Sequence, residues 1–172
     1  MAKINQTYLF CLDENRAFFD DVRKRFSDAS KYKVISFTSH TEFLKQLTAE
    51  KEHRFCKVAV LIIHEIRENG AQIEKLTREI KNTDPETGLI LIYPAEIGEA
   101  IKKAVKFNID AYIPRNSNSI LRLHNIVKRL ISKHSLEIFR KRRNRSLYIL
   151  LAFLLFCALA ILLAYLKMPE YF

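Results

Sequence analysis

The sequence predicts a doubly wound α/β domain with a five-stranded parallel sheet, followed by a long C-terminal helix that enters a membrane. Strand-like and helix-like blocks alternate five times over residues 1–133, and such alternation implies parallel strands with helices on both faces. Two strand-like blocks, 58–63 and 89–93, are continuously apolar, which is typical of strands buried on both faces. Residues 147–166 contain no charged residue, glycine or proline, which indicates a membrane span.

The five strands are expected at 8–12, 33–37, 58–63, 89–93 and 109–113. Each is followed by a block whose apolar residues recur at three- and four-residue steps, the spacing of one helix face. In chain order these apolar residues are Phe18, Phe19, Val22 and Phe26; Phe43, Leu44 and Leu47; Ile73, Leu76 and Ile80; Ile97, Ile101, Ala104 and Val105; and Ile120, Leu123, Val127 and Leu130. Ser39 or Thr41 can cap the second helix and Ser117 or Asn118 the fifth, and residues 84–88 predict a turn.

The apolar segment 147–166 has the length of a membrane span. Twenty helical residues at about 1.5 Å each reach about 30 Å, the hydrocarbon thickness of a bilayer. Tyr148 and Tyr165 lie near its two ends, where interfacial aromatic residues are favoured. The alternative, a buried core helix, is disfavoured because such a helix rarely stays apolar on every face.

Most of the net charge of +10 lies just before this segment, because residues 128–145 carry eight cations against Glu137 alone. The cations that flank the span directly are Arg140, Lys141, Arg142, Arg143 and Arg145. They predict an N-terminus in the cytoplasm and attraction to anionic lipid headgroups. Nucleic-acid binding is the alternative, but a basic stretch beside a span is better explained by the membrane, so we expect no nucleic-acid partner.

The predicted organisation has four parts: an α/β domain at 1–133, a basic juxtamembrane helix or linker at 134–146, a transmembrane helix at 147–166 and a short extracytoplasmic tail at 167–172. Residues 115–168 contain neither glycine nor proline, so the fifth helix can run unbroken into the span. A break near 132–135 or 144–146, where serine and asparagine occur, is the alternative. Three scattered cysteines and the lack of a signal peptide predict a reducing compartment without disulfides.

The chemistry expected of the domain depends on the strand ends. Residues 8–15 (YLFCLDEN) run from a strand into an acidic pair, residues 108–115 (NIDAYIPR) form the last strand, and His64 and Pro94 end the third and fourth strands thirty residues apart. This string of elements resembles a response-regulator receiver (CheY-like, flavodoxin-like) domain over residues 6–133. The resemblance implies a receiver-like version of the doubly wound fold.

The resemblance also implies a phosphorylation site, and the sequence departs from it. Receivers use two acidic residues to hold Mg²⁺, an aspartate as phosphoacceptor, a serine or threonine, and a lysine. Here Asp13 and Glu14 match the acidic pair in part, His64 (or Ile63, if the register shifts by one) replaces the phosphoacceptor, Pro94 replaces the hydroxyl residue and Arg115 replaces the lysine. Glu65, next to His64, is either a fixed negative charge in this pocket or a solvated loop residue. We therefore expect a degenerate receiver whose remnant pocket comprises these groups.

Other enzyme classes are disfavoured. With three glycines in the chain, neither a phosphate-binding loop nor a dinucleotide fingerprint can be formed. The five histidines include no zinc-binding pair at helical spacing. We expect no catalysis, no metal and no cofactor.

The resulting hypothesis is a membrane-anchored, non-phosphorylatable receiver-like module that regulates by interaction. It is expected to dock in the cytoplasm onto another integral membrane protein, or onto a second copy, through residues 96–133 and the span. One alternative is a signalling switch controlled by a ligand in the remnant pocket; another is a structural subunit of a transport, secretion or motor assembly. The expected location is a bacterial inner membrane, crossed once.

Overall fold

The computed structural model describes residues 6–13, 18–49, 55–64, 70–98, 101 and 109–167. The chain divides into two compact units, Met1–His134 and Ser135–Phe172.

The first unit is built on one parallel sheet with the strand order β2-β1-β3-β4-β5. The strands are β1 (Thr7–Leu12), β2 (Tyr32–Phe37), β3 (Cys56–Ile62), β4 (Gly88–Pro94) and β5 (Ala111–Arg115). The chain starts inside the sheet, adds β2 on one side and then builds β3 to β5 on the other. In such sheets the point where the strand order reverses, here between β1 and β3, is where ligands commonly bind.

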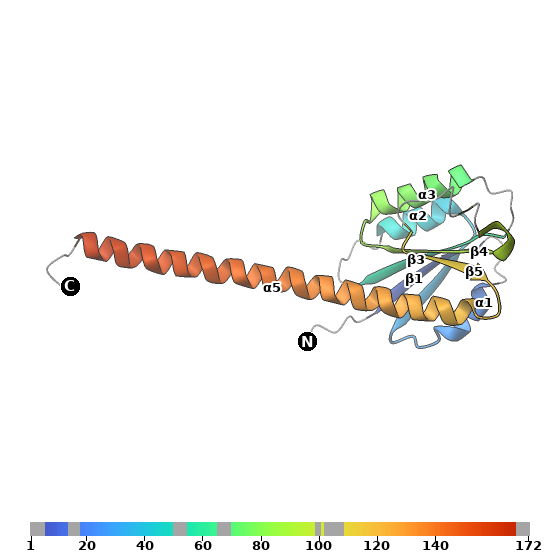
Figure 1. Ribbon diagram of the computed structural model, residues 1–172, viewed down its shortest axis with the longest axis horizontal. Helices are drawn as coiled ribbons and strands as arrows, with labels where there is room; N and C mark the ends of the chain where they lie inside the picture. The colour runs from blue at the N-terminus through green and yellow to red at the C-terminus, as the bar shows by residue number, and fades with distance from the viewer. Residues whose placement is uncertain are drawn as a thin grey trace. The chain divides into compact units, whose positions relative to one another are not determined.

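Helices cover both faces of this sheet (Figure 1). The helical elements are α1 (Phe19–Arg25), α2 (His40–Ala49), α3 (Gly70–Thr83), the 3₁₀ turn η1 (Ala95–Ile97) and α5 (Ser119–Lys167). Helices α2 and α3 pack on one face, where Phe43 and Ile80 are fully buried. Helix α1 and the start of α5 pack on the other, where Val22, Leu123 and Val127 are fully buried. The domain thus has two apolar cores separated by a sheet whose central strands are buried on both sides.

The predicted five-stranded α/β fold is confirmed, with small shifts of the element bounds. The fifth strand begins at Ala111 rather than residue 109 and extends to Arg115. Pro114 fits within β5 because β5 is an edge strand, where a missing backbone N–H can face away from the ladder. The predicted fourth helix lies mostly outside the described residues; within them, Ile97 belongs to η1 and Ile101 is buried.

Each of these helices begins directly after one of the two residues expected to cap it. Helix α2 begins at His40, directly after Ser39, whose backbone carbonyl accepts a hydrogen bond from the Phe43 N–H at 3.1 Å. Helix α5 begins at Ser119, so Asn118 takes the preceding position. The Asn118 carbonyl accepts the Arg122 N–H at 3.0 Å.

The second unit consists, in its described part, of the continuation of α5 to Lys167. The helix is continuous, and neither of the breaks considered as alternatives occurs. Large apolar side chains are exposed from Leu147 to Leu162. Within the residues that the structure describes, no helix is long and apolar enough to cross a membrane. The predicted span at 147–166 is therefore not supported, and it stays a prediction.

Candidate functional site

Three of the residues singled out in the sequence meet at one edge of the sheet. Asp13 directly follows β1, His64 lies two residues beyond β3, and Arg115 is the last residue of β5. Because all the strands are parallel, their carboxyl ends share an edge, which is the ligand-binding edge of doubly wound folds.

Asp13 is fully buried and is held by hydrogen bonds on both of its carboxylate oxygens. Its Oδ1 lies 2.5 Å from His64 Nε2, and its Oδ2 accepts the backbone N–H of Phe18 at 3.2 Å. Phe18 precedes α1, so the same carboxylate ties the end of β1 to the start of the first helix. Buried carboxylates need such partners, since an unpaired buried charge is costly.

Arg115 completes the arrangement from the other side of the imidazole. Its Nη1 lies 2.9 Å from His64 Nδ1, and its guanidinium stands over the Phe18 ring with 5.8 Å between Cζ and the ring centroid. Arginine can only donate hydrogen bonds, so Nδ1 must be the acceptor. The hydrogen of the imidazole therefore sits on Nε2 and is donated to Asp13. We call this set the Asp13–His64–Arg115 chain.

Of the other predicted pocket residues, Pro94 is described, and its side chain has no donor or acceptor with which to extend the Asp13–His64–Arg115 chain. Pro94 ends β4, pairs in register with Arg115 and is partly exposed. Glu14 and Glu65 lie outside the described residues. Phe18 was expected only as a core residue; its backbone N–H and its ring both serve the site, and nothing in the sequence marks that role.

The described residues do not fit the magnesium ion that the resemblance implies. Mg²⁺ prefers a set of hard oxygen ligands in octahedral geometry. The site presents one carboxylate that already bonds to His64 and Phe18, one imidazole and one guanidinium. In the part of the chain that is described, no three His, Cys, Asp or Glu side chains are grouped to hold a metal.

Cys11 lies on β1 two residues before Asp13 and is fully buried. Burial, together with the negative charge of Asp13, raises the pKa of its thiol to about 12. Because the thiolate is the reactive form, Cys11 is a packing residue and not a nucleophile.

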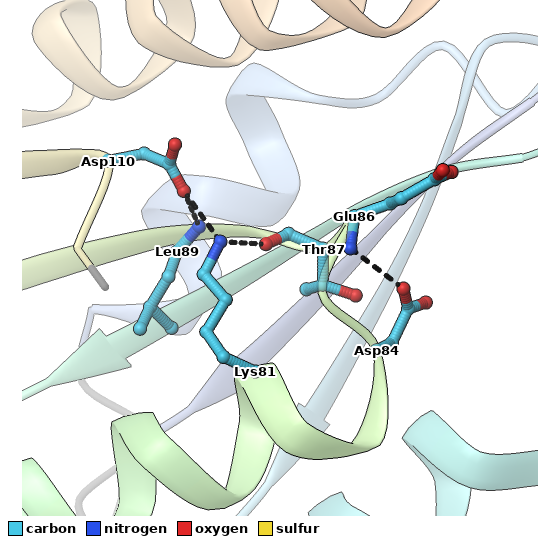
Figure 2. A network of polar contacts seen from close by, with 6 residues as sticks. All are labelled: Lys81, Asp84, Glu86, Thr87, Leu89 and Asp110. Atoms are coloured by element: carbon cyan, nitrogen blue, oxygen red, sulfur yellow. Dashed lines mark hydrogen bonds and ion pairs between the residues drawn. The ribbon is translucent and has the colours of Figure 1, made fainter.

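A second polar network lies at the opposite, amino-terminal end of β4 (Figure 2). Lys81 of α3 donates to the Thr87 carbonyl at 2.7 Å and to Asp110 Oδ2 at 3.2 Å. The same Asp110 oxygen accepts the Leu89 N–H at 2.8 Å. These contacts fasten α3 and the approach to β5 onto the start of β4, so their role is structural.

Lys57 extends the polar contacts at this end of the sheet. It lies within β3, and its Nζ is 2.8 Å from Asp84 Oδ2 in an ion pair whose side chains are 5% and 13% exposed. Burial raises the pKa of Asp84, but the Lys57 hydrogen bond and charge and the Glu86 N–H outweigh burial and lower it. Sequence reasoning missed this pair; the signal was a lysine at the edge of a continuously apolar strand.

Solved structures similar to this fold include response-regulator receiver domains. A receiver domain from Clostridium thermocellum is 18% identical, with a TM-score of 0.59 over 76% of this chain and 98% of that one. The receiver domain of an HD domain-containing protein from Pseudomonas fluorescens is 17% identical, with a TM-score of 0.58 and coverage of 76% and 98%. The structure of an adenylate cyclase from Rhodopirellula baltica has a TM-score of 0.62 at 9% identity, covering 80% of this chain and 96% of that one.

The class defined by these likenesses is the receiver-like α/β fold, and at such identities they show the fold alone. No protein-family model and no curated protein matches the sequence.

Proposed function

We propose that this protein is a membrane-anchored regulatory module of receiver fold that acts by interaction and is not phosphorylated. The observation that carries the proposal is the Asp13–His64–Arg115 chain. It fills the edge where a receiver would bind metal and phosphoryl group with side chains that already bond to one another.

The hydrogen bonds within the Asp13–His64–Arg115 chain leave no suitable nucleophile among the described residues at this edge of the sheet. In the tautomer that Arg115 requires, the imidazole has one lone pair, on Nδ1, and that lone pair accepts the Arg115 hydrogen bond. Asp13 Oδ1 is engaged by His64 and Oδ2 by Phe18. Phosphoryl transfer depends on positioning and on neutralising the transferred charge, chiefly with metal ions, and the donor set here does not fit that task.

Incubation of the detergent-purified chain with acetyl phosphate and Mg²⁺ tests this part of the proposal. We expect no phosphoryl adduct in the intact-mass spectrum and no shift in melting temperature, while a phosphorylatable receiver treated in parallel gains the adduct. An adduct on any residue of the site, or stabilisation by Mg²⁺ with beryllofluoride, would instead favour the switch controlled through the remnant pocket.

The anchoring part of the proposal draws on the C-terminal apolar segment. Side chains from Leu147 to Leu155 are exposed on every side of the helix, where water would leave them unfavourably hydrated. The apolar sequence continues to Leu166, whereas Leu162 is the last residue whose side chain is described. A bilayer is the environment that fits twenty such residues beside a cluster of cations, and the positive-inside bias places the receiver-like unit in the cytoplasm.

Extraction of native membranes distinguishes a chain that spans the membrane from a chain that adheres to its surface. We expect the chain to stay with the membrane in alkaline carbonate and in high salt and to leave it only in detergent. Release by carbonate would contradict the membrane anchor. It would not affect the proposal that the receiver-like unit is a regulatory module that is not phosphorylated.

The partner of the module is expected to be another integral membrane protein or a second copy, reached through residues 96–133. Purification of the tagged chain from its native membrane in mild detergent, with mass measurement, tests this expectation. A stoichiometric partner would favour an assembly subunit, for example of a transport, secretion or motor complex. A lone monomer would contradict docking.

A further inference from the structure

Among the described residues of the second unit, two large apolar side chains are exposed ahead of the apolar segment. Leu136 is 57% and Phe139 is 47% exposed, and the apolar segment begins only at Leu147. Arg140 and Arg143 are exposed as well. Their spacings of three, four and seven residues from Leu136 place these side chains on one side of the helix. We call Leu136, Phe139, Arg140 and Arg143 the Leu136–Arg143 face.

A bilayer that holds the apolar segment does not cover this apolar pair. At about 1.5 Å per residue, Phe139 lies about 12 Å and Leu136 about 17 Å before Leu147 along the helix. The headgroup region adds only about 5–8 Å to each side of the hydrocarbon core, and a tilt of about 40° still leaves about 9 Å and 13 Å. Helix side chains also lean toward the N-terminus, which is the side away from the span. The pair therefore lies beyond the headgroups.

Membrane topology accounts for the arginines of this face but not for its apolar side chains. Lysine and arginine are sufficient to set the orientation of a span, and phenylalanine stabilises an exposed helix less than alanine, lysine or glutamate does. Exposed apolar side chains are unfavourably hydrated. A leucine and an aromatic residue three positions apart are typical of a helix that inserts such anchors into an apolar groove of a partner.

A second copy is a poor occupant of this face. Residues 128–145 contain eight cations, with Glu137 as their single acidic residue. Two copies inserted in the same orientation would bring Arg140 and Arg143 of one helix beside those of the other, and such like-charge contacts are unfavourable. Charge complementarity therefore favours a partner that is acidic.

We propose that the Leu136–Arg143 face docks in an apolar groove rimmed by aspartate and glutamate, on the cytoplasmic segment of another integral membrane protein. This inference rests on the membrane-anchored module proposed above and names the chemistry of its partner. Leu136 and Phe139 fill the apolar centre of the contact, where a few buried anchors supply most of the binding free energy. Arg140 and Arg143 pair with carboxylates at the rim, which orients the contact and disfavours basic partners.

Photo-crosslinking of the full chain in its native membrane tests the proposal. In one chain p-benzoylphenylalanine replaces Phe139; in a second chain it replaces Phe153, which is 62% exposed within the apolar segment. After irradiation the crosslinked peptides are sequenced by mass spectrometry. We expect position 139 to crosslink to an acidic segment beside a membrane-spanning helix of another protein. We expect position 153 to crosslink to lipid or to an apolar membrane peptide.

Two variants of the position-139 chain test the apolar and the charged part of the face separately. Leu136→Gln should lower the crosslinking yield about fivefold, as expected for the loss of a buried anchor. Arg140→Gln with Arg143→Gln should lower the yield by about the same factor. The matched control, Lys45→Gln with Lys75→Gln, removes the same charge from exposed positions on α2 and α3 and should keep the yield. Circular dichroism verifies that each variant is folded.

Several outcomes at position 139 would overturn the proposal: an adduct with lipid, with a second copy, with the same chain or with a neutral or basic segment, or no adduct at all. An unchanged yield in either variant, or an equal loss in the control, would also overturn it. Position 153 reports the anchor separately. Without an adduct to lipid or to a membrane peptide there, the anchor fails, while an acidic adduct at position 139 still supports the Leu136–Arg143 face.

Discussion

At the scale of single residues, two buried polar groups form the main side-chain contacts at the two ends of the sheet. Asp13 is fully buried and bonds to His64 and Phe18. Lys57 is buried at the other end of the sheet and pairs with Asp84. Asp13 and its partners occupy the edge of the sheet that receivers use for chemistry. The Lys57–Asp84 pair ties β3 to the turn before β4.

Lys57→Met should destabilise the fold by about 3 kcal/mol, because it leaves Asp84 as a largely buried carboxylate without its partner. Adding Asp84→Asn should recover most of the loss. Since the folded-state pKa of Asp84 lies below its ordinary value of about 4, the contribution of the pair is complete above that pH and is lost as the pH falls through the lowered pKa. Urea unfolding of the full chain in mild detergent, at several pH values, measures both effects.

An unchanged stability of Lys57→Met at neutral pH would contradict this account. So would an acid-induced loss of the same size in Lys57→Met and the unmodified chain. Lys45→Met, at an exposed position on α2, is the control for replacing a lysine by an apolar side chain.

At the scale of elements, the packing of α1 against α5 depends on a titratable contact. Arg25 Nε donates to His124 Nδ1 at 2.8 Å, and the His124 ring meets the Phe26 ring edge to face at 5.4 Å. Burial and the positive charges of Arg25 and Lys128 lower the pKa of His124. The contact between α1 and α5 is therefore most stable while the His124 imidazole is neutral.

Acidification should loosen this contact. Because the pKa of His124 is lower in the folded chain than its ordinary value of about 6.5, its stabilising contribution is present above that pH and is lost as the pH falls through the lowered value. The melting temperature should thus fall between neutral and mildly acidic pH. In His124→Gln, whose amide oxygen can still accept from Arg25, that fall should be smaller. An identical pH profile in the two proteins would exclude His124 as its source.

The apolar patterns of the sequence explain which elements could be predicted from it. The apolar runs of β3 and β4 and the three- and four-residue spacing of α3 are direct consequences of burial, so sequence located them closely. The start of β5 was misplaced by two residues because Ile109 continues the apolar pattern, whereas the Asp110 side chain turns to hold Lys81 and the Leu89 N–H.

The candidate site could be predicted in its position but not in its bonding. Parallel strands bring Asp13, His64 and Arg115 to one edge of the sheet regardless of side-chain conformation. The position of each residue at a strand end was therefore sufficient to group them. That His64 bridges the other two depends on side-chain conformations that no periodicity encodes. The buried Lys57–Asp84 pair was missed for the same reason, since its partners lie 27 residues apart.

At the scale of the whole molecule, all five strands and both apolar cores lie in the first unit. A chain of residues 1–134 should therefore fold by itself, remain in solution without detergent and unfold cooperatively on heating. Circular dichroism with thermal unfolding checks this expectation. A truncated chain that aggregates or melts without a cooperative transition would show that the first unit needs the rest of α5.

The Asp13–His64–Arg115 chain has a consequence for how this fold can change over evolutionary time. Converting this site to a receiver's chemistry would require an aspartate at His64, a hydroxyl residue at Pro94 and a lysine at Arg115. Replacing His64 first would remove a hydrogen bond from a fully buried carboxylate, and replacing Arg115 first would leave the imidazole Nδ1 without its donor. Each single first step therefore costs stability before it supplies any receiver chemistry. The three side chains are coupled in this way, so this edge of the sheet should tolerate the replacement of all three together better than the replacement of any one alone.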